Sequence, residues 1–202
     1  MMQALLVAVR AVSPAEAVSA VLGLAYLLLA MRRNRWCWVA GGVSSVMLAY
    51  LSLRAHLPMQ AALQIYYVAM SVYGYWYWSR TSAQSAQAIT TWPVSHHLLA
   101  CTAVVAASVV SARWLARETQ AAWPYLDSLT TWGSLLTTWL VARVKLENWV
   151  YWVLIDAALA FLFAAQALYL FALLNALYVV IAFAGFNSWL KSYRTARAQA
   201  VS

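Results

Sequence analysis

The sequence predicts an all-α polytopic membrane protein with seven transmembrane helices. Of its 202 residues, 65% are hydrophobic and 9% are charged, and the mean hydropathy is +0.71. Soluble domains contain roughly 45–50% apolar and about 25% charged residues. Apolar runs of about 20 residues, which suffice to span a hydrocarbon core of ~30 Å, recur along the chain. The strands of a membrane barrel would alternate apolar and polar residues, and the sequence lacks that alternation.

Short connections separate the seven apolar segments that we expect to form the membrane helices. These segments run over about 14–31, 36–53, 58–78, 97–116, 123–141, 148–166 and 169–190. The longer connection Arg80–Ser95 is rich in Ser, Thr and Gln, which is typical of a linker between two halves. We expect the basic tail after Trp189 to fray into solvent. Arg10 interrupts the first apolar stretch and no clear cleavage site follows, so we predict no cleaved signal peptide.

The distribution of Lys and Arg predicts the orientation in the membrane. The net charge of +8 comes from basic residues between the apolar segments, a pattern that indicates membrane topology and not nucleic-acid binding. Nine of these residues fall on one predicted side: Arg32, Arg33, Arg35, Arg80, Arg143, Lys145, Lys191, Arg194 and Arg197. The other four are Arg10, Arg54, Arg113 and Arg117. Basic loops face the cytoplasm, so we expect the N-terminus outside and the C-terminus inside the bacterial inner membrane.

An internal repeat at a constant offset of 111 residues predicts how the seven helices are organised. The matched pairs are Glu16 and Asp127, Arg32 and Arg143, Trp38 and Trp149, Gln64 and Asn175, Tyr67 and Tyr178, Gly74 and Gly185, Trp78 and Trp189, and Arg80 and Lys191. We interpret residues 14–80 and 125–191 as one three-helix unit present twice. A parallel repeat of three helices needs one inverting crossing, which the fourth segment supplies.

The predicted architecture is therefore 3+1+3. Residues 1–80 form the first repeat with a short leader, residues 81–122 form the linker and the inverting helix, and residues 123–202 form the second repeat with the basic tail. Transporters of the sugar-carrying SWEET type use this arrangement, with the substrate bound between the repeats near the midplane.

Asp156 is the acid that most needs an explanation, because apolar residues flank it on both sides. A carboxylate in lipid costs roughly 2.5–3.5 kcal/mol on insertion scales, so we expect it to face the interior or a cavity. Asn148, Trp152 and Asp156 share one helical face at spacing i, i+4, i+8. Asp156 then either bonds to a neighbouring helix or acts as counter-charge for a polar or cationic solute, with the Trp152 ring as a stacking surface. The repeat matches Asp156 with Ser45, so the charge belongs to the C-terminal half alone.

The third helix of each predicted repeat carries a second polar constellation. One stripe contains Gln64, Tyr67, Ser71, Gly74 and Trp78, and the other contains Asn175, Tyr178, Ala182, Gly185 and Trp189. The small residues favour close helix packing. Packing explains the two amides less well, because an amide in hydrocarbon must find hydrogen-bond partners.

The other polar and aromatic residues have simpler interpretations. Glu16 follows Ser13 and Pro14 as in a capped helix start, and Glu147 is expected to cap a helix or balance its dipole. Asp127 begins a stripe of hydroxyl residues, Thr131, Ser134 and Thr138, which often bond to their own backbone. We expect the tryptophans at helix ends to form an interfacial belt: Trp36, Trp38, Trp76, Trp78, Trp149 and Trp189. We also expect Cys37 and Cys101 to be small buried apolar residues.

Known catalytic signatures are missing from the sequence. It contains no H-E-x-x-H, no G-x-S-x-G, no Cys/His cluster and no Walker A stretch. The three histidines show no metal-ligand spacing. We therefore predict neither an enzyme nor a primary pump, and we expect no cofactor and no metal.

Two stretches carry a resemblance to a known family. Gln64–Arg80 (QIYYVAMSVYGYWYWSR) and Glu147–Asp156 (ENWVYWVLID) resemble the bacterial PnuC vitamin transporters. The second stretch fits that family's W-x-x-W-x-x-x-[N/D] motif through Trp149, Trp152 and Asp156. The resemblance covers about residues 14–191, including Asp127 and Ser128. The chain departs from the family at Ser71 and at Ser44 or Ser45, where members often have Asn, and in the order of Tyr75 and Trp76.

The resemblance implies uptake of nicotinamide riboside, or of thiamine or another vitamin such as riboflavin, by facilitated diffusion. Phosphorylation by a separate cytoplasmic kinase would trap the solute, and family members can form homotrimers. The predicted substrate-binding residues are Gln64, Tyr67, Ser71, Tyr75, Trp149, Trp152, Asp156, Asn175 and Tyr178, with Asp127, Ser45 and Asn148 as further candidates. The alternative from a different class is a structural or assembly membrane protein.

Overall fold

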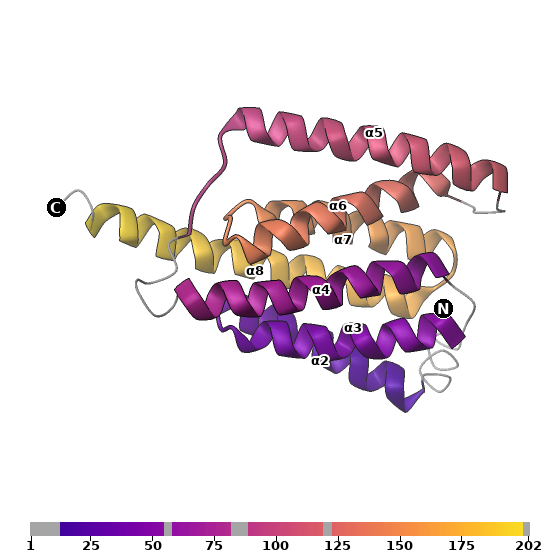
Figure 1. Ribbon diagram of the computed structural model, residues 1–202, viewed down its shortest axis with the longest axis horizontal. Coiled ribbons are helices and arrows are strands. Elements are labelled where there is room, and N and C mark those ends of the chain that lie inside the picture. The colour runs from indigo at the N-terminus through magenta and orange to yellow at the C-terminus, as the bar shows by residue number, and fades with distance from the viewer. Residues whose placement is uncertain (1–12, 55–57, 82–88, 119–122, 200–202) are drawn as a thin grey trace.

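Seven helices make up nearly all of the described structure. The structure is a computed structural model that describes residues 13–54, 58–81, 89–118 and 123–199. The helices are α2 (Pro14–Met31), α3 (Trp36–Arg54), α4 (Pro58–Thr81), α5 (Val94–Glu118), α6 (Pro124–Ala142), α7 (Asn148–Ala165) and α8 (Tyr169–Gln199) (Figure 1). Within these ranges one isolated β-bridge, between Thr90 and Lys145, accompanies them. The predicted fold class and helix number are confirmed, and the predicted leader lies outside the described residues.

Helix starts and ends follow local chemistry. Pro14 and Pro124 occupy first-turn positions, where a missing N–H costs nothing. Ser13 and Glu16 form the expected capping box, in which the Ser13 N–H donates to the Glu16 carboxylate at 2.7 Å and the Glu16 N–H donates to Ser13 Oγ at 3.2 Å. The acid at Glu16 is therefore a capping residue, as predicted.

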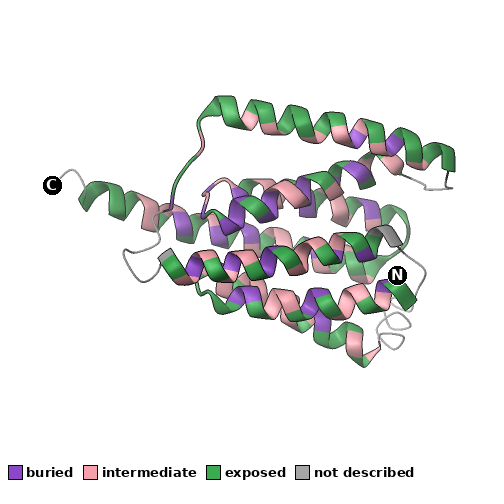
Figure 2. Cartoon of the chain, in the orientation of Figure 1, coloured by how far each residue is buried: buried purple, intermediate pink, exposed green. Residues whose placement is uncertain are grey.

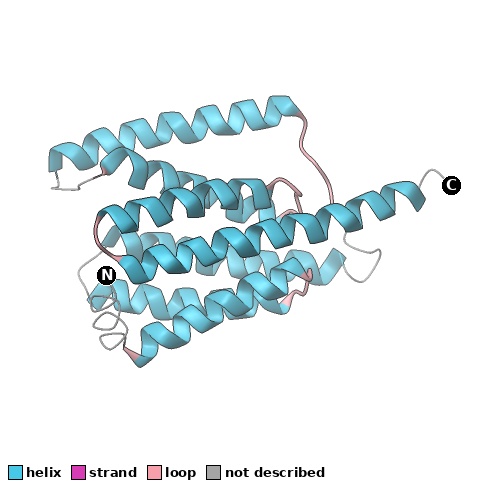
Figure 3. Cartoon of the chain, turned by 180° about the vertical axis from the view of Figure 1, so that it is seen from behind, coloured by secondary structure: helices cyan, strands magenta, loops and turns pink. Residues whose placement is uncertain are grey.

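The last helix is longer than its apolar run. α8 has 31 residues and at ~1.5 Å per residue is about 46 Å long, more than the ~30 Å hydrocarbon core. Figures 1 and 3 show its C-terminal part extending past the bundle. The prediction that the tail frays after Trp189 is wrong for residues 190–199. Lys, Arg, Ala and Gln are good helix formers, and cations at a helix C-terminus interact favourably with its dipole.

The polar side chains concentrate in α4 and α6. Among the described helices, five are long and apolar enough to cross a membrane, namely α2, α3, α5, α7 and α8. α4 and α6 are less apolar because their buried faces carry amides and hydroxyls. In α6 the Thr137 hydroxyl donates to the Gly133 carbonyl at 2.7 Å and the Thr138 hydroxyl to the Ser134 carbonyl at 2.8 Å. These bonds satisfy polar groups that could not be left bare inside a membrane.

Two groups of helices meet along two equivalent contacts. α2 packs against α3 and α3 against α4, while α6 packs against α7 and α7 against α8. The groups join where α4 meets α6 and where α8 meets α2. α5 lies on the outside against α6, and most of its surface is exposed (Figures 1 and 2). Exposed apolar side chains such as Leu98, Leu99 and Val110 suit contact with lipid.

Contacts recur at residues 111 apart, as the predicted repeat leads us to expect. Arg33 and Val144 both adopt the left-handed conformation, at φ 53° and φ 54°. The next amide closes the same turn in each case, since Asn34 N donates to the Leu29 carbonyl at 2.9 Å and Lys145 N to the Leu140 carbonyl at 3.0 Å. The α2–α3 and α6–α7 turns therefore have one design.

Four tryptophans in matching positions form a buried cluster at this end of the bundle. The Trp38 and Trp78 rings meet edge to face at 5.5 Å, and the Trp149 and Trp189 rings do the same at 5.5 Å. Trp78 and Trp189 also pack on each other, with ring centroids 6.5 Å apart. A Cβ on Gly74 or Gly185 would collide with the Trp38 or the Trp149 ring, so these glycines make room for the indoles.

The tryptophan cluster corrects the predicted interfacial belt. Trp36 and Trp76 are exposed, as a belt requires, whereas Trp38, Trp78, Trp149 and Trp189 are at most 2% exposed. The two groups also brace each other, because Trp78 Nε1 donates to the Ala142 carbonyl at 3.0 Å and Trp189 Nε1 to the Met31 carbonyl at 3.1 Å. A carbonyl at a helix end has no intrahelical partner, and the indole N–H supplies one.

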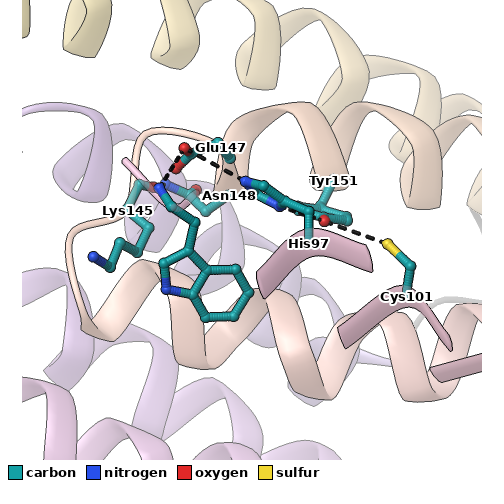
Figure 4. Close-up of polar contacts among 7 residues, drawn as sticks. His97, Cys101, Lys145, Glu147, Asn148 and Tyr151 are labelled. Atoms are coloured by element: carbon teal, nitrogen blue, oxygen red, sulfur yellow. Dashed lines mark hydrogen bonds and ion pairs between the residues drawn. The ribbon is translucent and has the colours of Figure 1, made fainter. Parts of the chain in front are cut away.

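The segment before α5 is docked onto the α6–α7 turn. Thr90 N donates to the Val144 carbonyl at 3.2 Å, and Leu146 N donates to the Thr90 carbonyl at 3.0 Å. Glu147 accepts a bond from Trp92 N at 2.8 Å and lies 3.6 Å from His97 Nε2 (Figure 4). The expectation that Glu147 caps α7 is wrong, since its side chain makes no cap bond.

The two cysteines have different surroundings. Cys37 is fully buried beside the tryptophan cluster, as predicted. Cys101 is exposed on α5, where its sulfur lies 3.5 Å from the Tyr151 hydroxyl (Figure 4). The prediction of a buried residue is wrong for Cys101, because α5 presents most of its surface outward.

Candidate functional site: a central cavity between the two groups of helices

A cavity of about 870 Å³ lies between α2, α3, α4 and α8. α6 and α7 each contribute one residue to its wall, Thr138 and Trp152. One end of the cavity reaches the exposed residues Glu16 and Gln60. The wall continues inward to Trp38, which belongs to the buried tryptophan cluster. The cavity is therefore a vestibule that begins at one end of the bundle and stops at the tryptophans.

Six predicted site residues line this cavity. They are Ser45, Gln64, Tyr67, Ser71, Trp152 and Tyr178. The stripe on α4 supplies three of them, because residues at i, i+3 and i+7 share one helical face. Trp152 enters from α7 and Tyr178 from α8, so the second repeat also contributes to the wall.

Several polar atoms in the cavity wall have no hydrogen-bond partner in the described part of the chain. These atoms are Gln64 Oε1, Trp152 Nε1 and Trp38 Nε1, and all of them are buried. A buried donor or acceptor without a partner costs roughly 1–3 kcal/mol. A solute that offers an acceptor to an indole N–H and a donor to the Gln64 oxygen would recover that cost.

Asp156 lies behind the cavity wall. Its carboxylate is 5% exposed, makes no side-chain hydrogen bond to any described residue, and is not part of the lining. It is near enough to Tyr67 and Tyr178 to interact with both electrostatically. The acid thus contributes a negative field to the place where the two tyrosines meet the cavity.

The other candidates lie outside the cavity lining. Trp149 packs in the tryptophan cluster, and Tyr75 packs against Trp36 at the same end of the bundle, with ring centroids 6.0 Å apart. Asn148 and Asn175 are buried and donate to backbone carbonyls of their own chain segment, those of Lys145 and Phe171. Asp127 is exposed in the first turn of α6.

Sequence reasoning missed the contribution of α2 to the site. Ser19, Gly23 and Tyr26 line the cavity, together with Gly41 and Ser44 of α3. The Ser44 hydroxyl donates to the Ser19 carbonyl at 2.9 Å, and Gly41 lies against the Tyr26 ring. The run Gly41-Gly42-Val43-Ser44-Ser45 was the available signal, because so many small residues in one apolar helix indicate a close approach.

The described residues contain no group of three or more His, Cys, Asp or Glu side chains that could hold a metal ion. The wall instead offers aromatic rings, hydroxyls and an amide. Such a set can bind a planar organic solute through stacking and hydrogen bonds.

Seven membrane-length helices around a polar, aromatic vestibule define the class of protein, a multi-pass membrane transporter. The family model of the nicotinamide mononucleotide transporters matches residues 13–191, so the chain belongs to that family. Its relatives and its fold are those of transporters and not of enzymes.

Two curated relatives illustrate the family. The chain is 25% identical to the nicotinamide riboside transporter PnuC of Escherichia coli (strain K12), over 93% of this chain and 89% of that protein. It is 26% identical to the riboflavin/roseoflavin transporter RibM of Streptomyces davaonensis, over 90% of this chain and 87% of that protein.

A solved structure has the same fold. The crystal structure of the vitamin B3 transporter PnuC matches with a TM-score of 0.71 at 22% identity, covering 88% of this chain and 81% of that chain. The vestibule described above therefore belongs to a known transporter architecture.

Proposed function

We propose that this protein takes up a vitamin precursor, nicotinamide riboside, across the bacterial inner membrane by facilitated diffusion. The observation that carries the proposal is the set of unpartnered polar atoms in an aromatic cavity backed by one acid. The family and the curated riboside transporter support the choice of substrate class.

The cavity wall matches the chemistry of a riboside with a carboxamide. Gln64 Oε1 can accept a hydrogen bond from an amide N–H or a sugar hydroxyl, and Trp152 Nε1 can donate to an amide oxygen or a hydroxyl. The indole of Trp152 and the phenol of Tyr67 give the flat ring a surface for stacking.

Asp156 selects for the positive charge of the nicotinamide ring. Two unit charges about 8 Å apart attract by about 2 kcal/mol at an effective dielectric constant near 20. The acid does not need to touch the solute, because the interior of the bundle screens it less than water would. Placing it behind the tyrosines avoids a bare carboxylate in the path of the solute.

We propose that the cavity faces the outside of the cell in this structure. Its exposed end lies near the start of α2 and the start of α4. The opposite end carries Arg32, Arg143 and Lys191 with most other basic residues, so the positive-inside rule assigns it to the cytoplasm. The tryptophan cluster then closes the cytoplasmic end.

The proposal includes two partners. A cytoplasmic kinase would phosphorylate the riboside, and the added charge would keep the product from returning through a cavity that contains an acid. Three copies of the chain would associate in the membrane. Native mass spectrometry of the purified protein tests the trimer, and loss of net accumulation without the kinase tests the trapping.

Riboflavin is the second candidate substrate. It is supported by the curated riboflavin/roseoflavin transporter among the relatives and by the cavity volume of about 870 Å³, which accommodates a tricyclic ring. Riboflavin is neutral at pH 7, whereas nicotinamide riboside carries a positive ring. This difference in charge allows one experiment to separate the two.

The test is the substitution Asp156→Asn, which removes the charge and keeps the shape. Binding of nicotinamide riboside to the purified protein, measured by calorimetry, should weaken on the order of tenfold, because the attraction of about 2 kcal/mol is lost. The exposed acid Glu118 provides the control, since Glu118→Gln should change nothing. Tight binding of riboflavin with no effect of Asp156→Asn would select the second candidate. Failure of the wild type to bind either compound would refute the proposed function.

A further inference from the structure

Two tyrosines at matching positions have different neighbours in the cavity wall. Tyr67 of α4 and Tyr178 of α8 are 111 residues apart and both line the cavity. The residues opposite them also match, because Gly23 of α2 and Ser134 of α6 differ by the same 111 residues. The two helix contacts are equivalent, α4 with α6 and α8 with α2.

The hydroxyl of Tyr67 already has a polar partner. It is in polar contact with the side chain of Ser134 on α6. Tyr178 faces Gly23 instead, and a Cβ added to Gly23 would lie 3.3 Å from the Tyr178 hydroxyl oxygen. The backbone distance is therefore short enough for a serine at position 23 to engage that hydroxyl, but glycine has no group with which to do so.

The Tyr178 hydroxyl is consequently available to a solute. Within the part of the chain that the structure describes, Tyr178 makes no side-chain hydrogen bond, and its side chain lines the cavity. Gln64 and Trp152, which hold the unpartnered Oε1 and Nε1 atoms, line the same cavity. A phenol both donates and accepts, which suits a sugar hydroxyl.

We propose that Gly23 is a specificity-determining residue, which leaves the Tyr178 hydroxyl free to bind the hydroxyl-bearing part of the solute. That part is the ribose of a riboside or the ribityl chain of a flavin. The inference rests on the proposed function and adds to it the group that reads the sugar. The repeat thus uses one tyrosine to hold α4 to α6 and the equivalent tyrosine to bind substrate.

The first experiment uses Gly23→Ser, Gly23→Ala and Tyr178→Phe, with calorimetry of nicotinamide riboside and riboflavin. Gly23→Ser occupies the phenol, and Tyr178→Phe removes its hydroxyl, so each should weaken binding about three- to tenfold, the effect of one net hydrogen bond. Gly23→Ala adds the Cβ without the hydroxyl and should weaken binding less than Gly23→Ser. The double variant Gly23→Ser with Tyr178→Phe should bind no more weakly than either single variant.

Two outcomes would overturn the inference while leaving the proposed function intact. One is a wild type that binds either compound together with unchanged binding by Gly23→Ser and Tyr178→Phe. The other is an equal loss in Gly23→Ala and Gly23→Ser, which would reveal simple crowding. A wild type that binds neither compound would instead remove the proposed function, and the inference with it.

A second measurement needs no solute. In the apo protein, Gly23→Ser should melt at a higher temperature than Gly23→Ala, because the serine hydroxyl bonds to Tyr178. The difference should vanish in the Tyr178→Phe background. A serine advantage that persists without the phenol hydroxyl would contradict the proposed contact, even if every variant bound substrate.

Discussion

Single residues in the tryptophan cluster divide into those that hold the fold and those that have a free donor. Trp78 and Trp189 each donate to a helix-end carbonyl of the other group of helices. Trp38 and Trp149 lie in the same cluster, but their Nε1 atoms have no partner among the described residues. This difference predicts unequal effects of the same substitution.

Replacing Trp78 or Trp189 with Phe should destabilise the protein by about 1–3 kcal/mol beyond the loss of ring area, because a buried carbonyl is left unpaired. The measurement is the melting temperature of the purified protein in detergent. Trp38→Phe and Trp149→Phe provide matched controls, since they remove a similar ring area and no bond. Equal shifts for all four variants would show that the two indole bonds contribute nothing.

The residue scale also shows what could be read from the sequence. Ser45, Gln64, Tyr67, Ser71, Trp152 and Tyr178 were predicted and do line the cavity, because polar groups in an apolar helix must turn inward. The sequence could not separate Trp149 from Trp152, which lie three positions apart in one motif. A glycine on the neighbouring helix, Gly185, determines that Trp149 packs into the cluster.

At the scale of elements, the turns carry backbone strain. Arg33, Val144 and Ala167 adopt positive φ without being glycine, with Ala167 at φ 58°. The left-handed conformation costs an L-residue roughly 1–2 kcal/mol. Val144 is buried and tied to Thr90, whereas Ala167 is exposed in the turn between α7 and α8. Ala167 is therefore the position at which relief of the strain is easiest to measure.

Ala167→Gly should stabilise the protein by about 0.5–1 kcal/mol, since glycine adopts positive φ without strain and the gain exceeds its extra entropy in the unfolded chain. Thermal unfolding in detergent checks the sign. The same substitution at Ala157, an exposed residue inside α7, should destabilise by a similar amount. Opposite signs at the two sites are the expected result, and a loss of stability at both would refute the argument from strain.

The element boundaries show a second limit of the sequence. The apolar run predicted an α8 ending near residue 190, because hydropathy reports where lipid ends and not where a helix ends. Lys191, Arg194 and Arg197 continue the helix into the region beyond the bundle. The docking of Thr90 on the α6–α7 turn had no signal in the sequence, since it depends on a chain crossing that only the assembled bundle creates.

At the scale of the whole molecule, the proposed orientation and open side can be tested together. Gln60 is exposed at the mouth of the cavity, and Lys191 is exposed at the opposite end of the bundle. In a Cys101→Ala background, which removes the exposed native thiol, Gln60→Cys in intact cells should react with a membrane-impermeant maleimide. Lys191→Cys should react only after the cells are opened.

Added nicotinamide riboside should slow the labelling of Gln60→Cys, because the solute occupies the cavity below it. Cys37 is buried and should not contribute to the signal. Reaction of Lys191→Cys in intact cells, with protection of Gln60→Cys until lysis, would reverse the proposed orientation. Labelling of Gln60→Cys that does not respond to riboside or to riboflavin would place the binding site elsewhere.

The sequence alone determined that this chain is a seven-helix membrane protein and that polar groups on α4, α7 and α8 face inward. Length, hydropathy and helical period are local properties, and the cost of polar groups in lipid turns them into firm constraints. The tertiary structure decided which tryptophans are buried, that Asp156 stands behind the cavity wall, and that Gly23 leaves Tyr178 free. Those features depend on which faces of distant helices meet, and only packing sets that.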